Sequence, residues 1–324
     1  MRLCRIRCLA SFILSSIINC FHPVCNTAID KFSAHAMIKT INYFVSEINL
    51  MNYQIVASDL DGTLLNNAGL ISPENLIAIH ALTELGAHFV PASGRGYSEM
   101  PQQIHDCPDI RYIIHSNGAS ILDRKTGERI LCCLTRQESI DILDVLDDYD
   151  VHITLRQGGE CYIDAHEQGP EKYAYYHVGK AHARITFDHG IHAENFHEFS
   201  RTLDNVELFA VHFHDNNERI ACRDRLRATS RFLVAEANAH NLEISALGAS
   251  KGSALLRLAD HLGIPHAATI GMGDSDNDTA MVKAAGLGLA MENACASLKE
   301  IADEVICNNE EHAVRYVLEH YCGE

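Results

Sequence analysis

The sequence predicts an α/β protein in which a doubly wound parallel core sheet is interrupted by an inserted α+β domain. Two observations lead to this fold class. After residue 51, short apolar segments alternate with amphipathic segments, which is typical of parallel strands joined by helices. From about residue 134 to residue 238, the alternation gives way to paired strands around a Gly-Gly turn, which indicates antiparallel hairpins. A chain of 324 residues is long enough for two such domains.

The first part of the core begins with the apolar segment 54–58, which predicts a buried parallel strand ending at a turn. A helix follows, because Ser72 and Pro73 form an N-cap and first-turn signal and Gly86 provides a stop. Residues 87–92 predict the second strand. Residues 112–115 predict a third strand of the same parallel sheet.

The inserted domain is indicated by strands at 151–155 and 161–164 on either side of Gln157-Gly158-Gly159-Glu160. Segments 206–214 and 232–236 predict two further strands with a helix between them. The predicted domains are an N-terminal extension at 1–50, a core formed by 51–133 and 239–324, and an insertion at 134–238.

The second part of the core is expected to resume with a strand at 242–244. A helix from Lys251 carries an apolar stripe at helical spacing. A strand at 267–270, a helix from Asp276 and a strand at 287–290 complete the alternation.

The composition restricts the possible partners. The hydrophobic content of 47% indicates a globular chain with a sizeable core. The formal net charge of −17 argues against nucleic acid and anionic membrane surfaces as partners, because both require a basic patch. The twelve cysteines have no CxxC pairing, which favours reduced thiols and a cytoplasmic location. The oligomeric state has no sequence signal.

Residues 1–50 differ from the rest of the chain. Three arginines precede a short apolar run at 8–18, which is similar to a signal peptide but too short and too polar to span a bilayer well. Met51 stands where the α/β pattern begins. We expect 1–50 to be an upstream extension or a loosely ordered arm, and we keep export as the alternative if they are a genuine leader.

Asp59 and Asp61 are the first chemical signal. They lie two residues apart at the carboxyl end of the first predicted strand, followed by Gly62 and Thr63. Open α/β sheets bind their ligands at this edge. One carboxylate can attack as a nucleophile while the other transfers protons. The alternative is an acidic turn that only ends a strand.

Two further stretches could hold an anion. Ser93 and Gly94 follow the second strand and precede a predicted helix, so a hydroxyl, a close backbone and helix amides can face a phosphate. An ordinary turn is the alternative. Lys251 lies in the first turn of its helix, where its charge opposes the helix dipole, and a bound anion would make this position favourable.

The segment from Gly271 to Asp278 supplies a cluster of hard oxygen ligands. It holds Asp274, Asp276, Asn277 and Asp278. Mg²⁺ prefers one or two such carboxylates together with waters and phosphate oxygens. An EF-hand calcium loop is excluded by spacing, because the next acid is too distant to close the loop.

Together these stretches resemble the four motifs of the haloacid dehalogenase-like superfamily of phosphohydrolases, in its Cof-type branch. The resemblance covers the chain from Met51 to about the C-terminus. It implies a Rossmann-like core and places the insertion where this superfamily carries its larger cap. The motif residues are, in order, Asp59, Asp61, Gly62 and Thr63; Ser93; Lys251; and Gly273, Asp274, Asn277 and Asp278.

The resemblance also implies a role for each residue. Asp59 would attack phosphorus and form an aspartyl-phosphate, and Asp61 would serve as general acid and then general base. Mg²⁺ would be held by Asp59, the backbone carbonyl of Asp61 and Asp274, with Asp278 behind these ligands. The phosphoryl group would be held by Ser93, Gly94, Lys251, Asn277 and a backbone amide near Leu60.

We therefore expect a Mg²⁺-dependent phosphatase of small phosphorylated metabolites, and we expect its substrates to be sugar phosphates. Two alternatives remain open at this stage. One is a phosphotransferase or mutase that passes the phosphoryl group to a sugar hydroxyl. The other is a phosphate-ester binding protein that kept the fold without catalysis.

Overall fold

The computed structural model describes residues 53–322, apart from the side chains of residues 181, 182, 237 and 238. These residues belong to one compact unit that runs from Met51 to Gly323. The expectations for residues 1–50 lie outside the described residues. Between residues 53 and 322, no helix has the length and apolar character needed to cross a bilayer.

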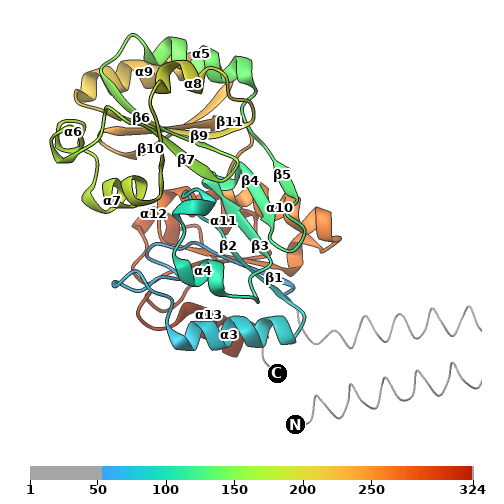
Figure 1. Ribbon diagram of the computed structural model, residues 1–324. Coiled ribbons are helices and arrows are strands. Elements are labelled where there is room, and N and C mark those ends of the chain that lie inside the picture. Colours follow the sequence, from blue (N-terminus) through green and yellow to red (C-terminus); the bar gives the residue numbers. More distant parts are fainter. Residues whose placement is uncertain (1–52, 323–324) are drawn as a thin grey trace, which may run out of the picture. The chain divides into compact units, whose positions relative to one another are not determined.

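A five-stranded parallel sheet forms the core, as the sequence predicts (Figure 1). β1 lies between β12 and β2 and is parallel to both, and the sheet continues in parallel through β13 to β14. The strands in sheet order are β14 (Glu304–Val305), β13 (Leu287–Ala290), β12 (Thr269–Gly273), β1 (Ile55–Ser58) and β2 (His88–Pro91).

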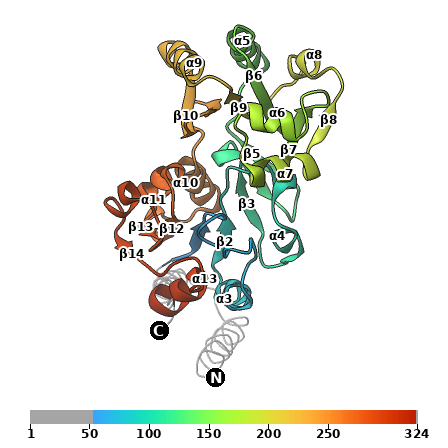
Figure 2. The ribbon, with the colours of Figure 1, turned by 90° about the vertical axis from the view of Figure 1, so that its left-hand side faces the viewer.

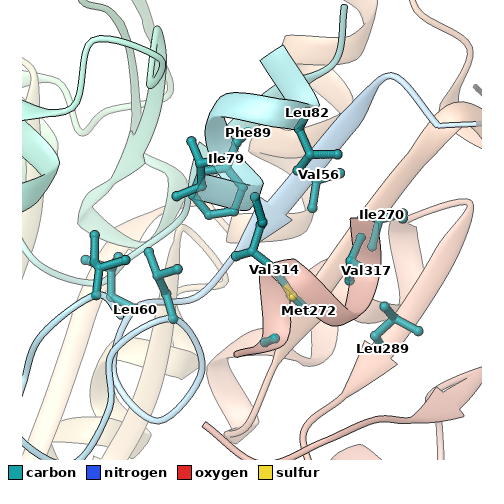
Figure 3. Packing of buried hydrophobic residues seen from close by; sticks show 14 of the residues in the cluster. Val56, Leu60, Ile79, Leu82, Phe89, Ile270, Met272, Leu289, Val314 and Val317 are labelled. Carbon is teal, nitrogen blue, oxygen red and sulfur yellow. The ribbon is translucent and has the colours of Figure 1, made fainter. Parts of the chain in front are cut away.

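Helices cover both faces of this sheet, so its strands are buried on two sides. α3 (Pro73–Glu84) and α13 (Ala313–Val317), followed by η5 (Leu318–Cys322), pack on one face through the apolar cluster drawn in Figure 3. On the other face, α10 (Lys251–Leu262) packs against β1 and β2, and α11 (Thr279–Ala284) contacts α10 and β12. Three short helices complete the second half: η3 (His266–Ala268), η4 (Asp276–Asp278) and α12 (Ala296–Lys299).

The predicted start of α3 is confirmed. The Oγ of Ser72 accepts the backbone N–H of Asn75 at 3.2 Å, and Pro73 occupies the first helical position. The helix ends at Glu84 with Leu85 as its C-cap, and Gly86 follows with a φ of +92°. A left-handed conformation after the last turn is the usual reason for a glycine there.

The third predicted strand does not belong to the parallel sheet. β3 (Tyr112–His115) pairs antiparallel with β4 (Ser120–Asp123), which pairs with β5 (Arg129–Leu131) in a separate three-stranded sheet. One parallel bridge between Ala92 and Ile114 links it to the end of β2. The prediction was wrong because the short segments of β4 and β5 carry no clear strand pattern of their own.

The helical segment expected after Ser93 and Gly94 consists of two short pieces. A single 3₁₀ turn, η1 (Tyr97–Glu99), follows, and then the five-residue helix α4 (Gln102–Asp106). Pro101 stands between them and cannot donate a backbone hydrogen bond, which separates the two turns.

The inserted domain is built on a six-stranded sheet (Figures 1 and 2). α5 (Arg136–Leu146), α8 (Phe196–Ser200) and α9 (Asn216–Ala228) pack on its apolar face. The remaining helices of the domain are α6 (Pro170–Tyr175) and α7 (Lys180–His189). The strands in sheet order are β10 (Phe232–Asn238), β11 (Asn241–Ala246), β9 (Val206–Phe213), β6 (Val151–Gln157), β7 (Glu160–Asp164) and β8 (Ile191–Ala193).

The predicted hairpin at 157–160 is confirmed. β6 and β7 are joined by Gly158 and Gly159, which have φ values of +64° and +83°. Two consecutive positive φ angles match the tight turns that suit the twist of a hairpin.

The expectation for residues 242–244 was wrong. They lie in β11, which pairs antiparallel with β10 and β9, so the sheet of the inserted domain extends to Ala246. The apolar residues of this segment alternate with polar ones, and this pattern belongs to a sheet with one polar face rather than to a strand buried on both sides.

Candidate active site

The two aspartates of the first motif lie at the carboxyl end of β1 in different environments. The backbone N–H of Asp59 donates to the carbonyl of Met272 at 3.0 Å, which continues the pairing of β1 with β12. The Asp59 side chain is buried. The Asp61 side chain is 60% exposed. A buried carboxylate can be held in one orientation for attack, while an exposed one can exchange protons.

Lys251 joins the first, third and fourth motifs. Its ammonium group donates to Asp59 Oδ1 at 2.6 Å and to Asp278 Oδ1 at 2.7 Å. Asn277 Oδ1 lies 3.4 Å from the same nitrogen. The Lys251 side chain is only 1% exposed, so this charge is balanced by its carboxylate partners rather than by water.

The helix that carries Lys251 is fixed at its start. Ser250 and Ser253 form a reciprocal cap, in which the Ser250 hydroxyl accepts the Ser253 backbone N–H at 3.1 Å. The Ser253 hydroxyl accepts the backbone N–H of Ser250, also at 3.1 Å. This arrangement sets the direction of the first turn, from which Lys251 reaches the end of β1.

The charges in this cluster are not balanced within the protein. Burial alone would lower the pKa of Lys251, but the carboxylates of Asp278 and Asp59 outweigh burial and raise this pKa. Burial and the charge of Asp278 raise the pKa of Asp59. The same two causes raise the pKa of Asp274. Three carboxylates around one ammonium group therefore leave an excess of negative charge that a cation would relieve.

The acidic cluster fits a divalent cation. Oxygens of Asp59, Asp274 and Asp278 lie within 4.8 Å of one another. Asp278 uses one oxygen for Lys251 and the other for the backbone N–H groups of Asp274 and Ser275, at 3.0 and 3.1 Å. Asp59 and Asp274 are therefore the better candidates for direct ligands, and hard carboxylate oxygens are the donors that Mg²⁺ prefers.

The loop after β1 is shaped by its contact with Asp274. Thr63 donates its hydroxyl hydrogen bond to Asp274 Oδ1 at 3.2 Å. Gly62 has a φ of +79°, and a β-carbon at this position would lie 2.5 Å from Asp274 Oδ2. Glycine is required here because both the backbone conformation and the close approach exclude a side chain.

Asp61 is held by Arg95, which we did not include among the sequence-predicted site residues. Arg95 Nη2 donates to Asp61 Oδ1 at 2.6 Å and Nε donates to Oδ2 at 3.0 Å. Arg95 Nη1 also donates to the carbonyl of Glu99 at 3.2 Å. The paired contact orients the Asp61 carboxylate. The arginine stands directly after Ser93 and Gly94, so its position in that motif was the available signal.

Ser93 and Gly94 leave β2 at the same edge of the sheet as Asp59 leaves β1. The backbone N–H of Ala92 donates to the carbonyl of Ser58 at 2.8 Å, which aligns the two strand ends. The Ser93 hydroxyl accepts the backbone N–H of Arg95 at 3.2 Å. Leu60 is buried beside Asp59, and its carbonyl accepts the backbone N–H of Leu65 at 2.8 Å.

Asn117 is a second residue that the sequence reasoning missed. Its backbone N–H donates to the carbonyl of Ser93 at 3.0 Å, and a β-carbon on Gly94 would lie 3.0 Å from its Oδ1. Asn117 therefore borders the loop of Ser93 and Gly94. The Asn117-Gly118 pair after β3 was the available signal, because a turn that follows a strand at this edge belongs to the site.

The parallel α/β core and its acidic cluster fit a hydrolase, and the comparisons with known proteins agree on this class. A family model described as haloacid dehalogenase-like hydrolase matches residues 56–318. The chain belongs to this family.

Curated relatives and solved structures agree with this assignment. Phosphatase YwpJ of Bacillus subtilis is 30% identical over 285 residues, which cover 82% of this chain and 99% of that protein. A 5-amino-6-(5-phospho-D-ribitylamino)uracil phosphatase, YcsE, of the same organism is 27% identical and covers 84% of this chain and 96% of its own length. A haloacid dehalogenase-like hydrolase structure from B. subtilis superposes with a TM-score of 0.70 at 28% identity, covering 82% of this chain and 99% of that one.

Proposed function

We propose that this protein is a Mg²⁺-dependent phosphatase that hydrolyses small phosphorylated metabolites, with sugar and polyol phosphates as its main substrates, through an aspartyl-phosphate. The observation that carries the proposal is the position of Lys251, whose ammonium group joins Asp59 and Asp278 at 2.6 and 2.7 Å beside the acidic cluster. Phosphoryl transfer requires mainly such positioning and charge neutralisation.

The first step belongs to Asp59 and Asp61. A carboxylate oxygen of Asp59 attacks phosphorus, and the bond between phosphorus and the leaving oxygen breaks. Asp61 gives its proton to that oxygen, so the leaving group departs as an alcohol. In the second step, Asp61 takes a proton from water while the water oxygen attacks phosphorus, which frees Asp59 and releases inorganic phosphate.

The remaining residues hold the group that is transferred. Lys251, Ser93 and Asn277 would bind phosphoryl oxygens, with the backbone at Gly94 and Leu60 completing the cradle. Asp59, the Asp61 carbonyl and Asp274 would hold Mg²⁺, which supplies charge neutralisation at the phosphoryl group when bound. Asp278 fixes Lys251 and the loop of Asp274 through its three hydrogen bonds.

The relatives support the choice of substrate class. Three of the B. subtilis relatives are named for a phosphorylated ribityl compound, whose leaving group is a neutral polyol derivative. The scattered cysteines of the sequence support a cytoplasmic location, where such metabolites occur.

The Asp59→Asn variant tests the nucleophile. It keeps the shape of the side chain and removes its ability to form an aspartyl-phosphate, so phosphate release from p-nitrophenyl phosphate with Mg²⁺ should fall by at least about a thousandfold. Asp224→Asn, whose side chain on α9 is 62% exposed, is the control and should retain full activity. Turnover by Asp59→Asn at the wild-type rate would refute the assignment. Detection of inorganic phosphate rather than a new sugar phosphate separates hydrolysis from phosphotransfer.

A further inference from the structure

The sheet of the inserted domain has one apolar and one polar face. Leu155, Phe209 and Ile244 point to the apolar face, where they pack with the helices. The alternate positions carry Arg156 on β6 and Glu243 on β11, and these belong to the opposite face because β6, β9 and β11 are paired in register. Much of this polar face is covered within the protein, because Arg156 is buried and the rings of Tyr173 and Tyr176 pack on His152 of β6. Glu243 is only half-buried and remains accessible at this face.

This polar face contacts the catalytic core through Glu243. Asn117 Nδ2 donates to Glu243 Oε2 at 2.6 Å. Asn117 is the residue that borders Gly94 in the candidate phosphate-binding loop. Asn117 therefore lies between Glu243 and the loop where the phosphoryl group of a substrate would bind. Glu243 approaches this loop from the inserted domain.

Asn117 also retains an unused hydrogen-bonding atom. Its Oδ1 is buried and has no hydrogen-bond partner within the described part of the chain. Asn117 has a φ of +52°, in a turn where Ser116 and Gly118 also have positive φ values. Backbone strain of this kind is found where side chains are held for a function.

The arginines nearest this contact already have partners. Arg156 forms a buried ion pair with Glu99, with 2.6 Å between Nε and Oε2. Arg129 donates to the carbonyl of Gly158 at 2.8 Å and lies 3.8 Å from Glu207. Neither arginine forms an ion pair with Glu243 in the described part of the chain. Arg156 is nevertheless near: burial lowers its pKa, while Glu99 and, less strongly, Glu243 raise it.

The strand next to β11 offers apolar surface. Leu233 and Ala235 on β10 pair with Ser245 and Glu243 and share their face of the sheet. Leu233 is 38% exposed, and Ala235 is exposed as well. An acceptor for hydroxyl groups therefore lies beside an exposed apolar strip.

We infer that Glu243 and Asn117 are specificity-determining residues that bind the leaving group of the substrate. The carboxylate of Glu243 accepts hydrogen bonds from its hydroxyl groups and repels a second phosphate or carboxylate. The substrate is then a monophosphate whose leaving group is neutral and rich in hydroxyls. This inference rests on the proposed phosphatase function and adds to it a choice among phosphate esters.

The test compares substrates with and without hydroxyls on the leaving group. The substrates are ribitol 5-phosphate, fructose 6-phosphate, fructose 1,6-bisphosphate and p-nitrophenyl phosphate, each with Mg²⁺. For the wild type we expect kcat/KM to be at least about tenfold higher for the two monophosphates than for the bisphosphate. Glu243→Gln should lower kcat/KM for the polyol phosphates by about tenfold and leave p-nitrophenyl phosphate unchanged. Glu243→Lys should shift the preference toward the bisphosphate.

The aryl phosphate also reports on folding, because its hydrolysis requires only the core. Equal losses on both kinds of substrate would assign Glu243 a structural role and overturn the inference. The same holds if Glu243→Gln changes neither activity, or if the wild type uses the bisphosphate as well as the monophosphate. Glu218→Gln on α9 is the matched control.

Failure of the proposed function would be seen separately. In that case the wild type releases phosphate from none of the four esters. The role of Glu243 is then tested by calorimetry, which compares the binding of ribitol 5-phosphate by Asp59→Asn with its binding by the double variant Asp59→Asn with Glu243→Gln. Weaker binding of this ester after Glu243→Gln, with unchanged binding of inorganic phosphate, supports that role. Equal binding of the ester by both proteins refutes it.

Discussion

At the scale of single residues, the site depends on one buried cation among three carboxylates. Lys251 contacts Asp59 and Asp278, at 2.6 and 2.7 Å. Such a group is costly to bury unless its partners are also fixed, and the capped helix and the Asp278 hydrogen bonds fix them. A lysine at the start of a helix is unfavourable by itself and becomes favourable here through its partners.

Replacing Lys251 by Met should therefore affect both activity and stability. Without this charge at the phosphoryl group, phosphate release should fall by more than about a hundredfold. The two carboxylates would lose their counter-ion, so the free energy of unfolding should drop by about 3–5 kcal/mol at a pH where both are ionised. Chemical denaturation and a phosphate-release assay measure the two effects, with Lys299→Met as the control.

The stability of this variant should depend on pH in a defined direction. With Lys251 in place, burial and then the charge of Asp278 raise the pKa of Asp59 from 3.8 to about 8. Lys251 lowers this pKa, so its removal should raise the pKa further, and the metal-free folded state binds a proton more tightly than the unfolded chain does. Stability is then gained as the pH falls through this window and lost as it rises. The loss of unfolding free energy caused by Lys251→Met should be smaller at about pH 5 than at about pH 9. A cost that is equal at both values would contradict this account.

At the scale of secondary structure, the site depends on how closely loops approach one another. Gly118 has a φ of +90°, and a β-carbon there would lie 2.1 Å from the carbonyl oxygen of Ser250. Ser250 is the N-cap of α10, which carries Lys251. The turn after β3 therefore supports the start of α10 directly. The same turn positions Asn117 against the loop after β2.

The Gly118→Ala variant tests this contact against a matched control. Gly127 also has a positive φ, +78°, but a β-carbon on Gly127 would meet nothing within 4 Å. Gly127→Ala should lower the free energy of unfolding by about 1 kcal/mol, because alanine is strained in this backbone conformation. Gly118→Ala should cost at least about 2 kcal/mol more and should lower activity, because the start of α10 must move. Equal costs in thermal and chemical denaturation would show that the close approach is unimportant.

At the scale of the whole chain, the inserted domain is joined to the core by buried polar contacts. Arg156 on β6 and Glu99 in η1 form an ion pair in which both side chains are at most 3% exposed. Ser116 donates its hydroxyl hydrogen bond to Glu207 on β9 at 2.7 Å. Polar contacts specify one arrangement of two surfaces better than apolar contacts do, since each buried group requires its partner.

Arg156→Met should weaken the contact between the inserted domain and the core. It removes the counter-ion of Glu99, so the free energy of unfolding should fall by about 3–5 kcal/mol. Arg231→Met, which removes an exposed pair with Asp141, is the control and should cost less than about 1 kcal/mol. Restoration of stability in the double variant Arg156→Met with Glu99→Leu would confirm that the unpaired charge caused the loss. If Arg156→Met is as stable as the control, the pair contributes little to the join.

Removal of residues 1–50 tests whether the compact unit that begins at Met51 folds and functions without them. Every residue of the candidate site lies between Asp59 and Asp278, within the compact unit that begins at Met51. A chain of residues 51–324 should fold, retain full phosphate release and have a Tm equal to or higher than that of the whole chain. Circular dichroism melting and the activity assay measure this. Aggregation of the shortened chain would show that the first fifty residues are needed.

The sequence by itself determined the parallel core, the inserted domain and the family. The core and the inserted domain follow from local features, since strand and helix periods and glycine turns are set by neighbouring residues. The family was indicated by the resemblance of four motifs. The candidate residues Asp59, Ser93, Lys251 and Asp274 were also proposed in this way, because each lies just after a strand or opens a helix at the edge where parallel strands end.

Only the tertiary structure decided the partners of these residues. Arg95 holds Asp61, Asn117 borders Gly94, and Glu243 reaches the core from a strand that the sequence placed in the wrong sheet. Strand 112–115 was misplaced for the same reason. Pairing between distant strands depends on which surfaces are left to bury after the chain collapses, and no local pattern records that choice.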